Sequence, residues 1–205
     1  MCALKKKYFD NREIIFHSRD MARHKSGFTK LTDPAIETKF WKEFVSIVSS
    51  DDIAVYFVIT DKKRAQKLGW QPVTILRRSY LRILSEFARH LKATNSHGKI
   101  INESEPSQDT HLIYAHNRLQ STGIGDGSVD AQEYKRMVTS LSLVNKANLD
   151  IDVQISDALA PIAGIKYRLD NNQKIKVTLA ERVKYDLIEK KLDGKTSSSL
   201  FEILV

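Results

Sequence analysis

Residues 53–59 read Ile-Ala-Val-Tyr-Phe-Val-Ile, a continuous apolar run rich in β-branched and aromatic side chains. Such a run is typical of a strand covered on both faces, because a strand with one wet face alternates apolar and polar residues. Helices are expected on either side. Asp33-Pro34 has the sequence of a helix start, and a longer helix is expected from about Pro72 to Lys92. A strand between helices predicts an α/β fold with at least partly parallel pairing.

The same alternation of strands and helices continues along the chain. Further strands are expected at residues 14–16, 99–103, 139–144 and 200–205. Further helices are expected after Pro106, at 153–168 with Pro161 inside, and from the capping-box sequence Thr178–Glu181 to about Gly194. Loops are expected at 21–31 and at 123–128, where a glycine-rich stretch lacks the Gly-Lys-Ser/Thr of a phosphate loop. We find no repeat or linker, so we expect one domain spanning 1–205.

Composition narrows the classes of protein to consider. The chain has 205 residues, of which 41% are hydrophobic, as expected for a folded domain. Its apolar runs are much shorter than the roughly 20 residues that cross a bilayer, and the first residues do not resemble a secretory signal. We therefore expect a cytoplasmic protein without a membrane partner. Cys2 is the single cysteine, and no Cys/His cluster has zinc-ligand spacing, so a metal would require carboxylates.

The chain is basic, with 33 Lys and Arg against 25 Asp and Glu and a formal charge of +8. This balance favours polyanionic partners, here RNA or DNA, through neutralisation of phosphates. Four basic residues of the long helix share one face: Arg78, Arg82, Arg89 and Lys92. That face is either an ordinary solvated surface or a row of phosphate contacts, and the pattern fits both.

Three acidic residues are candidates for chemistry. Glu103 ends an apolar strand, where open α/β sheets place their ligand sites, but it could also be an ordinary exposed residue. Asp157 lies in a largely apolar helical segment, where an ionised carboxylate is costly unless a cation or hydrogen-bond donors compensate it. A metal would offset that cost, and so would a position at a helix N-terminus. Asp109 could merely cap the helix that follows Pro106.

A polar cluster follows the expected strand at 14–16. It reads His17-Ser18-Arg19-Asp20, and a strand that ends there would deliver these groups to a loop. His17 and Arg19 are candidates for contacts with phosphate. A hydrogen-bonded network within the loop is the alternative explanation.

Three of these segments together resemble the family known as domain of unknown function 3800. Residues 153–163 resemble the family signature Leu-Gln-Ile-Ala-Asp-Leu-Ile-Ala-Tyr-Pro, whose aspartate falls on Asp157. Residues 100–105 resemble its strand ending in Ala-Glu-Ser, which places the family's acid at Glu103. The segment 15–20 resembles its strand followed by His-Ser-Arg-Asp. The resemblance spans nearly the whole chain.

The resemblance implies a ribonuclease-H-like mixed sheet flanked by helices and a metal-dependent nuclease that hydrolyses phosphodiester bonds. In such a site two divalent ions, Mg²⁺ or Mn²⁺, activate a water and stabilise the leaving oxygen. By resemblance, Glu103 and Asp157 are metal ligands, and Asp109 is a further catalytic carboxylate. His17, Arg19, Arg78 and Arg82 are then the residues that contact the nucleic acid.

The sequence departs from the family at its start. Family members begin with a strand carrying Asp-Glu-Ser-Gly and a second strand, before a Lys-rich helix like Leu4–Tyr8, and nothing here corresponds to them. We therefore expect an N-terminally truncated fold that binds metal only if the missing strand is supplied. Its exposed strand edges could lead to a homo-oligomer. The alternative function is a non-catalytic module that binds nucleic acid or protein through its basic surface.

Overall fold

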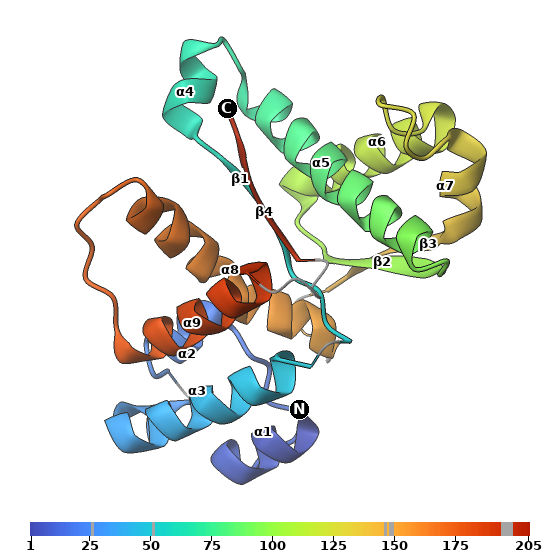
Figure 1. Ribbon diagram of the computed structural model, residues 1–205. Helices are drawn as coiled ribbons and strands as arrows, with labels where there is room; N and C mark the ends of the chain where they lie inside the picture. Colours follow the sequence, from blue (N-terminus) through green and yellow to red (C-terminus); the bar gives the residue numbers. More distant parts are fainter. Residues whose placement is uncertain (26, 51, 146, 148–149, 194–198) are drawn as a thin grey trace. The chain divides into compact units, whose positions relative to one another are not determined.

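Figure 1 shows the computed structural model, which describes residues 1–25, 27–50, 52–145, 147, 150–193 and 199–205. The chain divides into two compact units. The helical unit comprises Met1–Val55 and Ala147–Leu200, and the α/β unit comprises Tyr56–Lys146 and Phe201–Val205. Two compact units can still belong to one folding domain. The single domain expected from the sequence therefore stays a prediction. Within the described residues, no helix combines the length and apolar composition needed to cross a bilayer.

The helical unit is built on α3 (Pro34–Val48), which packs against α1 (Cys2–Phe9), the short 3₁₀ helix η1 (Thr29–Thr32) and α9 (Leu179–Asp193). Helix α8 (Ile151–Asp170) packs against α9 and against α2 (Ser18–Ala22). Aromatic rings fill the space around α3. Phe40 and Phe44 are fully buried, and the Phe16 ring meets the Phe40 ring edge-on at 5.7 Å. The core of this unit is therefore largely aromatic, in a geometry that ring pairs prefer.

Two helices of this unit begin where the sequence predicts. The Asp33 carboxylate accepts hydrogen bonds from the amides of Ala35 and Ile36 and so caps α3. At α9, the Thr178 hydroxyl accepts from the Glu181 amide while the Glu181 carboxylate accepts from the Thr178 amide. Both caps satisfy amides that lack a partner within the first turn.

The α/β unit contains two pairs of strands. β2 (Gly98–Glu103) and β3 (Val138–Val144) run parallel, with Ile100 opposite Leu141 and Glu103 opposite Val144. β1 (Tyr56–Thr60) pairs with β4 (Leu200–Leu204), whose first residue falls in the helical unit. The Leu200 amide donates to Val55 and the Asp61 amide to Leu204, so this pair is parallel as well.

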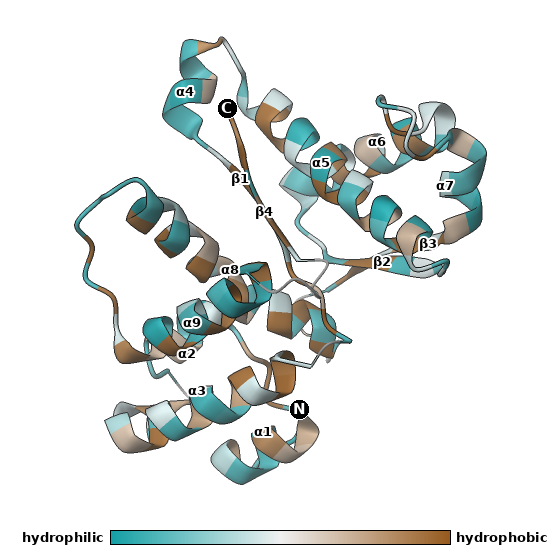
Figure 2. Cartoon of the chain, in the orientation of Figure 1, coloured by the Kyte–Doolittle hydropathy of each residue, from teal (hydrophilic) through white to brown (hydrophobic). Residues whose placement is uncertain are grey.

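Helices cover these strands and supply most of the core. α5 (Pro72–Ala93) packs against β1, α6 (Pro106–Thr122) and α7 (Ala131–Met137), while α4 (Lys62–Lys67) follows β1. Figure 2 shows apolar and polar residues alternating around α5, as its amphipathic sequence predicts. The buried residues of its apolar stripe are Leu84, Ala88 and Leu91. They meet Leu112, Ala115 and Leu119 of α6, which the sequence also predicts to face the core.

The fold is α/β, as expected from the sequence, and the parallel pairing is confirmed at β2 and β3. The glycine-rich segment 123–128 is a loop, and residues 200–204 form a strand. The expected end of the last helix at Gly194 lies outside the described residues.

Two expected strands differ from the structure. Residues 14–16 form no strand, because the Phe16 amide donates to the Gln154 side chain at 3.0 Å instead of to a neighbouring strand. β1 is half-buried along its whole length and has one described neighbour, β4, so the expectation of an internal strand covered on both faces is wrong. In both segments, the apolar composition alone does not identify which other part of the chain is the hydrogen-bonding neighbour.

Candidate functional site

The Asp157 carboxylate joins two polar segments that lie 139 residues apart in the sequence. Asp157 is carried by α8, and α2 begins at Ser18. The Ser18 amide donates to Asp157 Oδ2 at 2.8 Å, and the Ser18 hydroxyl donates to Oδ1 at 3.4 Å. His17 Nδ1 lies 3.3 Å from Oδ2. These four groups define what we call the Asp157 site.

Hydrogen-bond donors compensate the charge of Asp157. The amide of Ser18 is an N-terminal amide of α2, which has no partner within its own helix and favours a negative charge. The Asp157 and His17 side chains are also 32% and 33% exposed, so water reaches both of them. A bound cation is therefore not required to explain a carboxylate at this place in α8.

Gln154 extends the same junction one turn earlier on α8. Its Oε1 accepts hydrogen bonds from the Phe16 amide at 3.0 Å and from Lys5 Nζ at 2.7 Å. Lys5 is almost fully buried, and burial lowers the pKa of its amine. Gln154 could have been found from the sequence, since a residue three positions before Asp157 lies on the same helix face. Lys5 could not have been found in this way, because the run Lys5-Lys6-Lys7 resembles a solvated surface.

Lys184 is a buried amine that the sequence analysis did not single out. Its residue is 7% exposed, and Nζ lies 3.9 Å from the centre of the Trp41 ring. Burial lowers the Lys184 pKa to about 8, against the opposing charges of Glu181, Glu37 and Asp157. The attraction of a cation to an aromatic face also favours the protonated form. The Asp157 carboxylate thus acts on a buried charge as well as on its own hydrogen-bond donors.

The other candidate carboxylates belong to the α/β unit. Asp109, in the first turn of α6, accepts a hydrogen bond from the Ser104 hydroxyl at 2.7 Å and one from the Glu105 amide at 2.9 Å. Asp109 thus binds the amide of Glu105, the N-cap residue of α6, but it does not cap the first-turn amides of the helix as the sequence analysis allowed. Glu103 is the half-buried last residue of β2, at the carboxyl end of the parallel pair. Both residues therefore lie where β2 leads into α6.

The described residues do not provide a complete set of metal ligands. No group of three or more His, Cys, Asp and Glu among them is arranged to hold a metal ion. Both Asp109 oxygens accept hydrogen bonds from groups four and five residues away, and Asp157 has the donors of the Asp157 site. The donors present thus fit hydrogen-bonded carboxylates better than a bound divalent ion. The metal-ligand roles of Glu103 and Asp157 stay predictions.

The basic face of α5 has acidic partners within the protein. Arg82 forms ion pairs with Glu86 and Glu202. Arg89 binds Glu86 and Asp126, and Lys92 binds Glu133. Arg78 instead stacks on the Trp70 ring at 4.1 Å. A phosphate at this face would compete with these carboxylates, which favours the solvated-surface explanation.

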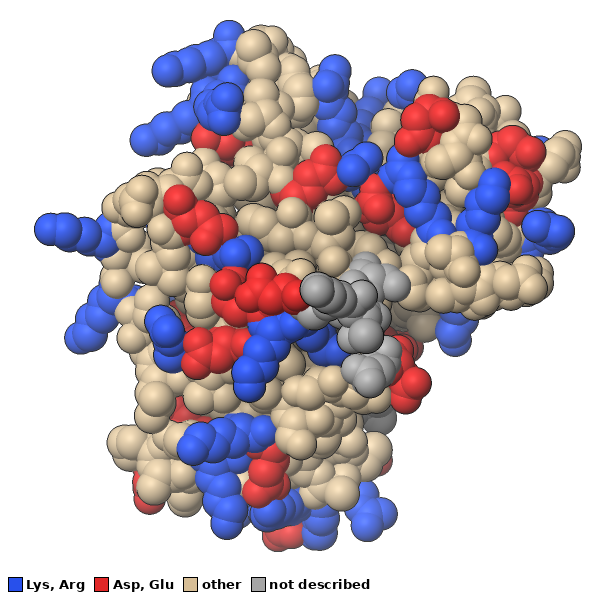
Figure 3. Space-filling model, viewed as in Figure 1, with Lys and Arg blue, Asp and Glu red and all other residues tan. Residues whose placement is uncertain are grey.

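Charges of both signs are interspersed elsewhere as well. Figure 3 shows lysine and arginine side chains among aspartate and glutamate over the face in view, without one continuous basic patch. Arg19 is exposed on α2, close in sequence to the Asp157 site. Of the four residues expected to contact nucleic acid, His17 and Arg19 thus belong to the neighbourhood of Asp157, whereas Arg78 and Arg82 belong to α5.

Comparison of the chain with protein-family models, with curated proteins and with solved structures gave no match.

Proposed function

We propose that this chain hydrolyses phosphodiester bonds of RNA or DNA and that the Asp157 site carries the reaction. One observation supports the proposal most directly. Two segments that carry the family resemblance, 15–20 and 153–163, meet through the hydrogen bond from the Ser18 amide to Asp157. Residues so distant in sequence meet in any folded core, but here the groups that meet are a carboxylate, a hydroxyl and an imidazole open to water.

His17 and Asp157 have a geometry suited to acid–base chemistry. A carboxylate 3.3 Å from Nδ1 favours the tautomer that carries its proton on Nδ1, which leaves Nε2 able to accept a proton from water. In this proposal His17 is the base that activates water, and Asp157 orients the ring. The exposed Arg19 on the same helix would contact the substrate phosphate.

The resemblance adds a ribonuclease-H-like fold to the proposal. Parallel pairing of β2 and β3 next to α5, α6 and α7 supports an α/β fold of this general kind. The described ligand set is incomplete, so the acid–base role of His17 is the part of the proposal that rests on geometry.

A nuclease assay on the intact chain tests the proposal. Fluorescently labelled single-stranded RNA and DNA are incubated with the wild type, with Asp157→Asn and with Asp152→Asn, each with MgCl₂ and with EDTA. Asp152 is a matched control, because it lies exposed in the first turn of the same helix. We expect cleavage by the wild type and the control, and a loss of about 100-fold or more in Asp157→Asn. Equal activity of the three proteins would overturn the assignment.

The same assay distinguishes a nuclease from the alternative function, a non-catalytic module that binds nucleic acid. A chain that cleaves neither substrate under either condition, but binds them with an affinity that falls steeply with salt, would be a nucleic-acid-binding module. His17→Gln tests whether His17 is the general base, since a general base is expected to set the acidic limb of the pH–rate profile. Loss of that limb in His17→Gln, with folding intact, would support the role of His17.

A further inference from the structure

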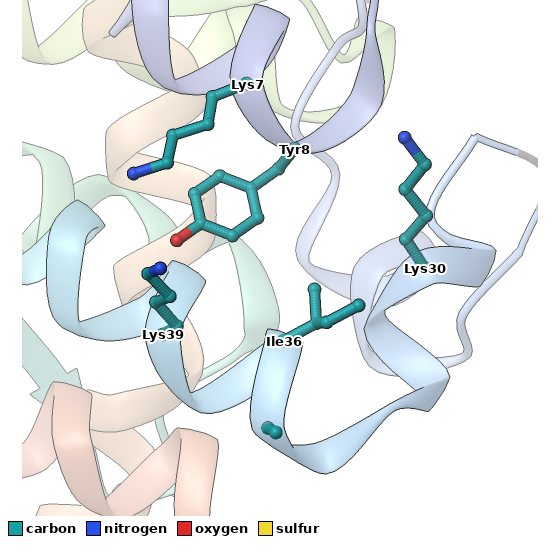
Figure 4. A pocket seen from close by; sticks show the side chains of 6 residues that line it. Lys7, Tyr8, Lys30, Ile36 and Lys39 are labelled. Carbon is teal, nitrogen blue, oxygen red and sulfur yellow. The ribbon is translucent and has the colours of Figure 1, made fainter.

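A pocket of about 500 Å³ lies in the helical unit between α1, η1 and α3. Figure 4 shows Lys7, Tyr8 and Lys39 on one side of the pocket and Lys30 on the other, with Ile36 between them. Three of its six lining residues are lysines, and Ala35 and Ile36 add apolar surface. The pocket is open to solvent, because four of its lining residues are exposed: Lys7, Lys30, Ala35 and Lys39.

The lysines of this pocket differ in their partners. Lys7 Nζ binds both oxygens of Glu43, at 2.7 and 2.8 Å, and the Tyr8 hydroxyl donates to the same carboxylate at 2.9 Å. Within the described part of the chain, no carboxylate lies close enough to Lys30 or Lys39 for an ion pair. The pocket therefore keeps two amines that can neutralise an incoming anion.

Nearby carboxylates are engaged by other lysines. The pKa of Glu43 is lowered, first by the hydrogen bond from Lys7, so Glu43 stays ionised and holds Lys7 in place. The pKa of Asp10 is lowered mainly by Lys6, with a smaller effect of the Lys30 charge. Lys30 and Lys39 therefore act on these acids only at longer range, and an anion inside the pocket would meet less competition than one at the α5 face.

We propose that this pocket binds a nucleotide, with the phosphate between Lys30 and Lys39 and the apolar part of the ligand against Ala35 and Ile36. A phosphate carries enough charge to neutralise two amines, and lysine binds it as a point charge. Inorganic phosphate alone would use the lysines but not the apolar surface of Ala35 and Ile36. The ligand is either a free nucleoside monophosphate or the phosphorylated end of a nucleic-acid strand, and both present the same chemistry.

Calorimetric titration of the intact protein with adenosine 5′-monophosphate tests the proposal. Adenosine and inorganic phosphate are titrated separately, at low salt. The pocket variant is Lys30→Gln/Lys39→Gln. The control is Lys42→Gln/Lys190→Gln, which removes the same charge at exposed positions of α3 and α9. We expect binding of the nucleotide to weaken about tenfold or more in the pocket variant and less than about twofold in the control.

The ligand source and the independence of the two proposals are tested with the same variants. A short oligonucleotide with a 5′-phosphate, compared with its 5′-hydroxyl form, identifies a strand end as the source if it binds more tightly than the free nucleotide. Asp157→Asn should bind the nucleotide as the wild type does, so a failure of the nuclease proposal leaves this result unaffected. Absence of nucleotide binding by the wild type, or equal weakening in both double variants, would overturn the inference.

Discussion

Asp157 and Asp109 were both expected to be catalytic carboxylates, yet they are held in different ways. Asp109 accepts hydrogen bonds from Ser104 and Glu105, its neighbours in the sequence. Asp157 accepts hydrogen bonds from Ser18, at the opposite end of the chain sequence. The first contact could form in an isolated turn and helix, whereas the second exists only after the helical unit has folded. The hydrogen bond to Ser18 therefore depends on tertiary structure, and Asp157 also has the His17 imidazole beside it.

The largest expected effect on stability concerns Lys184, the buried amine on which the Asp157 charge acts. Burial lowers the Lys184 pKa from 10.5 to about 8, so the folded protein loses this proton at a lower pH than the unfolded chain. The free energy of unfolding of the wild type should therefore rise between pH 8 and 10.5. Below pH 8 the folded protein carries the full cost of burying the protonated Lys184 amine. The difference between the two pKa values corresponds to roughly 3 kcal/mol, less whatever the Trp41 ring contributes to the protonated form.

Lys184→Met isolates this effect. Urea unfolding at several pH values should show the free energy of unfolding of the wild type approaching that of Lys184→Met as the pH rises from 8 to 10.5. Other titrating groups are common to both proteins and cancel in the difference. Lys190→Met, at an exposed position of the same helix, is the control and should show a constant difference from the wild type. A constant difference for Lys184→Met as well would contradict the burial of a charged amine.

A second, smaller effect is expected for the long-range carboxylate itself. Asp157→Ala should lower the free energy of unfolding at pH 7 by about 2 kcal/mol, because it removes hydrogen bonds to a charged acceptor and leaves the Ser18 amide without its partner. Asp186→Ala is the control, since Asp186 is exposed and pairs with Arg182 one turn away. Its cost should stay below about 0.5 kcal/mol. Equal costs in urea denaturation would mean that the Asp157 contact adds nothing to stability.

The same distinction between local and long-range contacts explains what the sequence could predict. The caps at Asp33 and Thr178 and the amphipathic helix α5 follow from residues close in sequence or from regular periodicity. A local role for Asp109 at the start of α6 was among the alternatives for the same reason. Parallel pairing follows from the alternation of strands and helices, which does not say which strands pair. For these elements, the local pattern of residue types is enough to predict the secondary structure.

Partners far away in the sequence were not predictable in the same way. Phe16 was assigned to a strand, but its amide binds Gln154 and its ring joins the aromatic core. The basic residues of α5 were grouped correctly on one face, whereas their carboxylate partners, such as Glu202 for Arg82, lie up to 120 residues away. A lysine in the sequence likewise does not reveal whether it is paired, as Lys7 is, or lies in a pocket without a described ion pair, as Lys39 does.

The smallest expected effect is that of the local carboxylate. Asp109→Ala should cost about 1 kcal/mol, the usual range for loss of a hydrogen bond, because water can replace part of what Ser104 and Glu105 donate. Asp109→Asn keeps an acceptor and should cost less. It should also lower the pKa of Tyr80, which burial raises first and the Asp109 charge raises further. Ultraviolet titration of tyrosine and urea denaturation measure the two effects. A cost for Asp109→Ala that equals or exceeds that of Asp157→Ala would contradict the expectation that the long-range contact contributes more to stability than the local one.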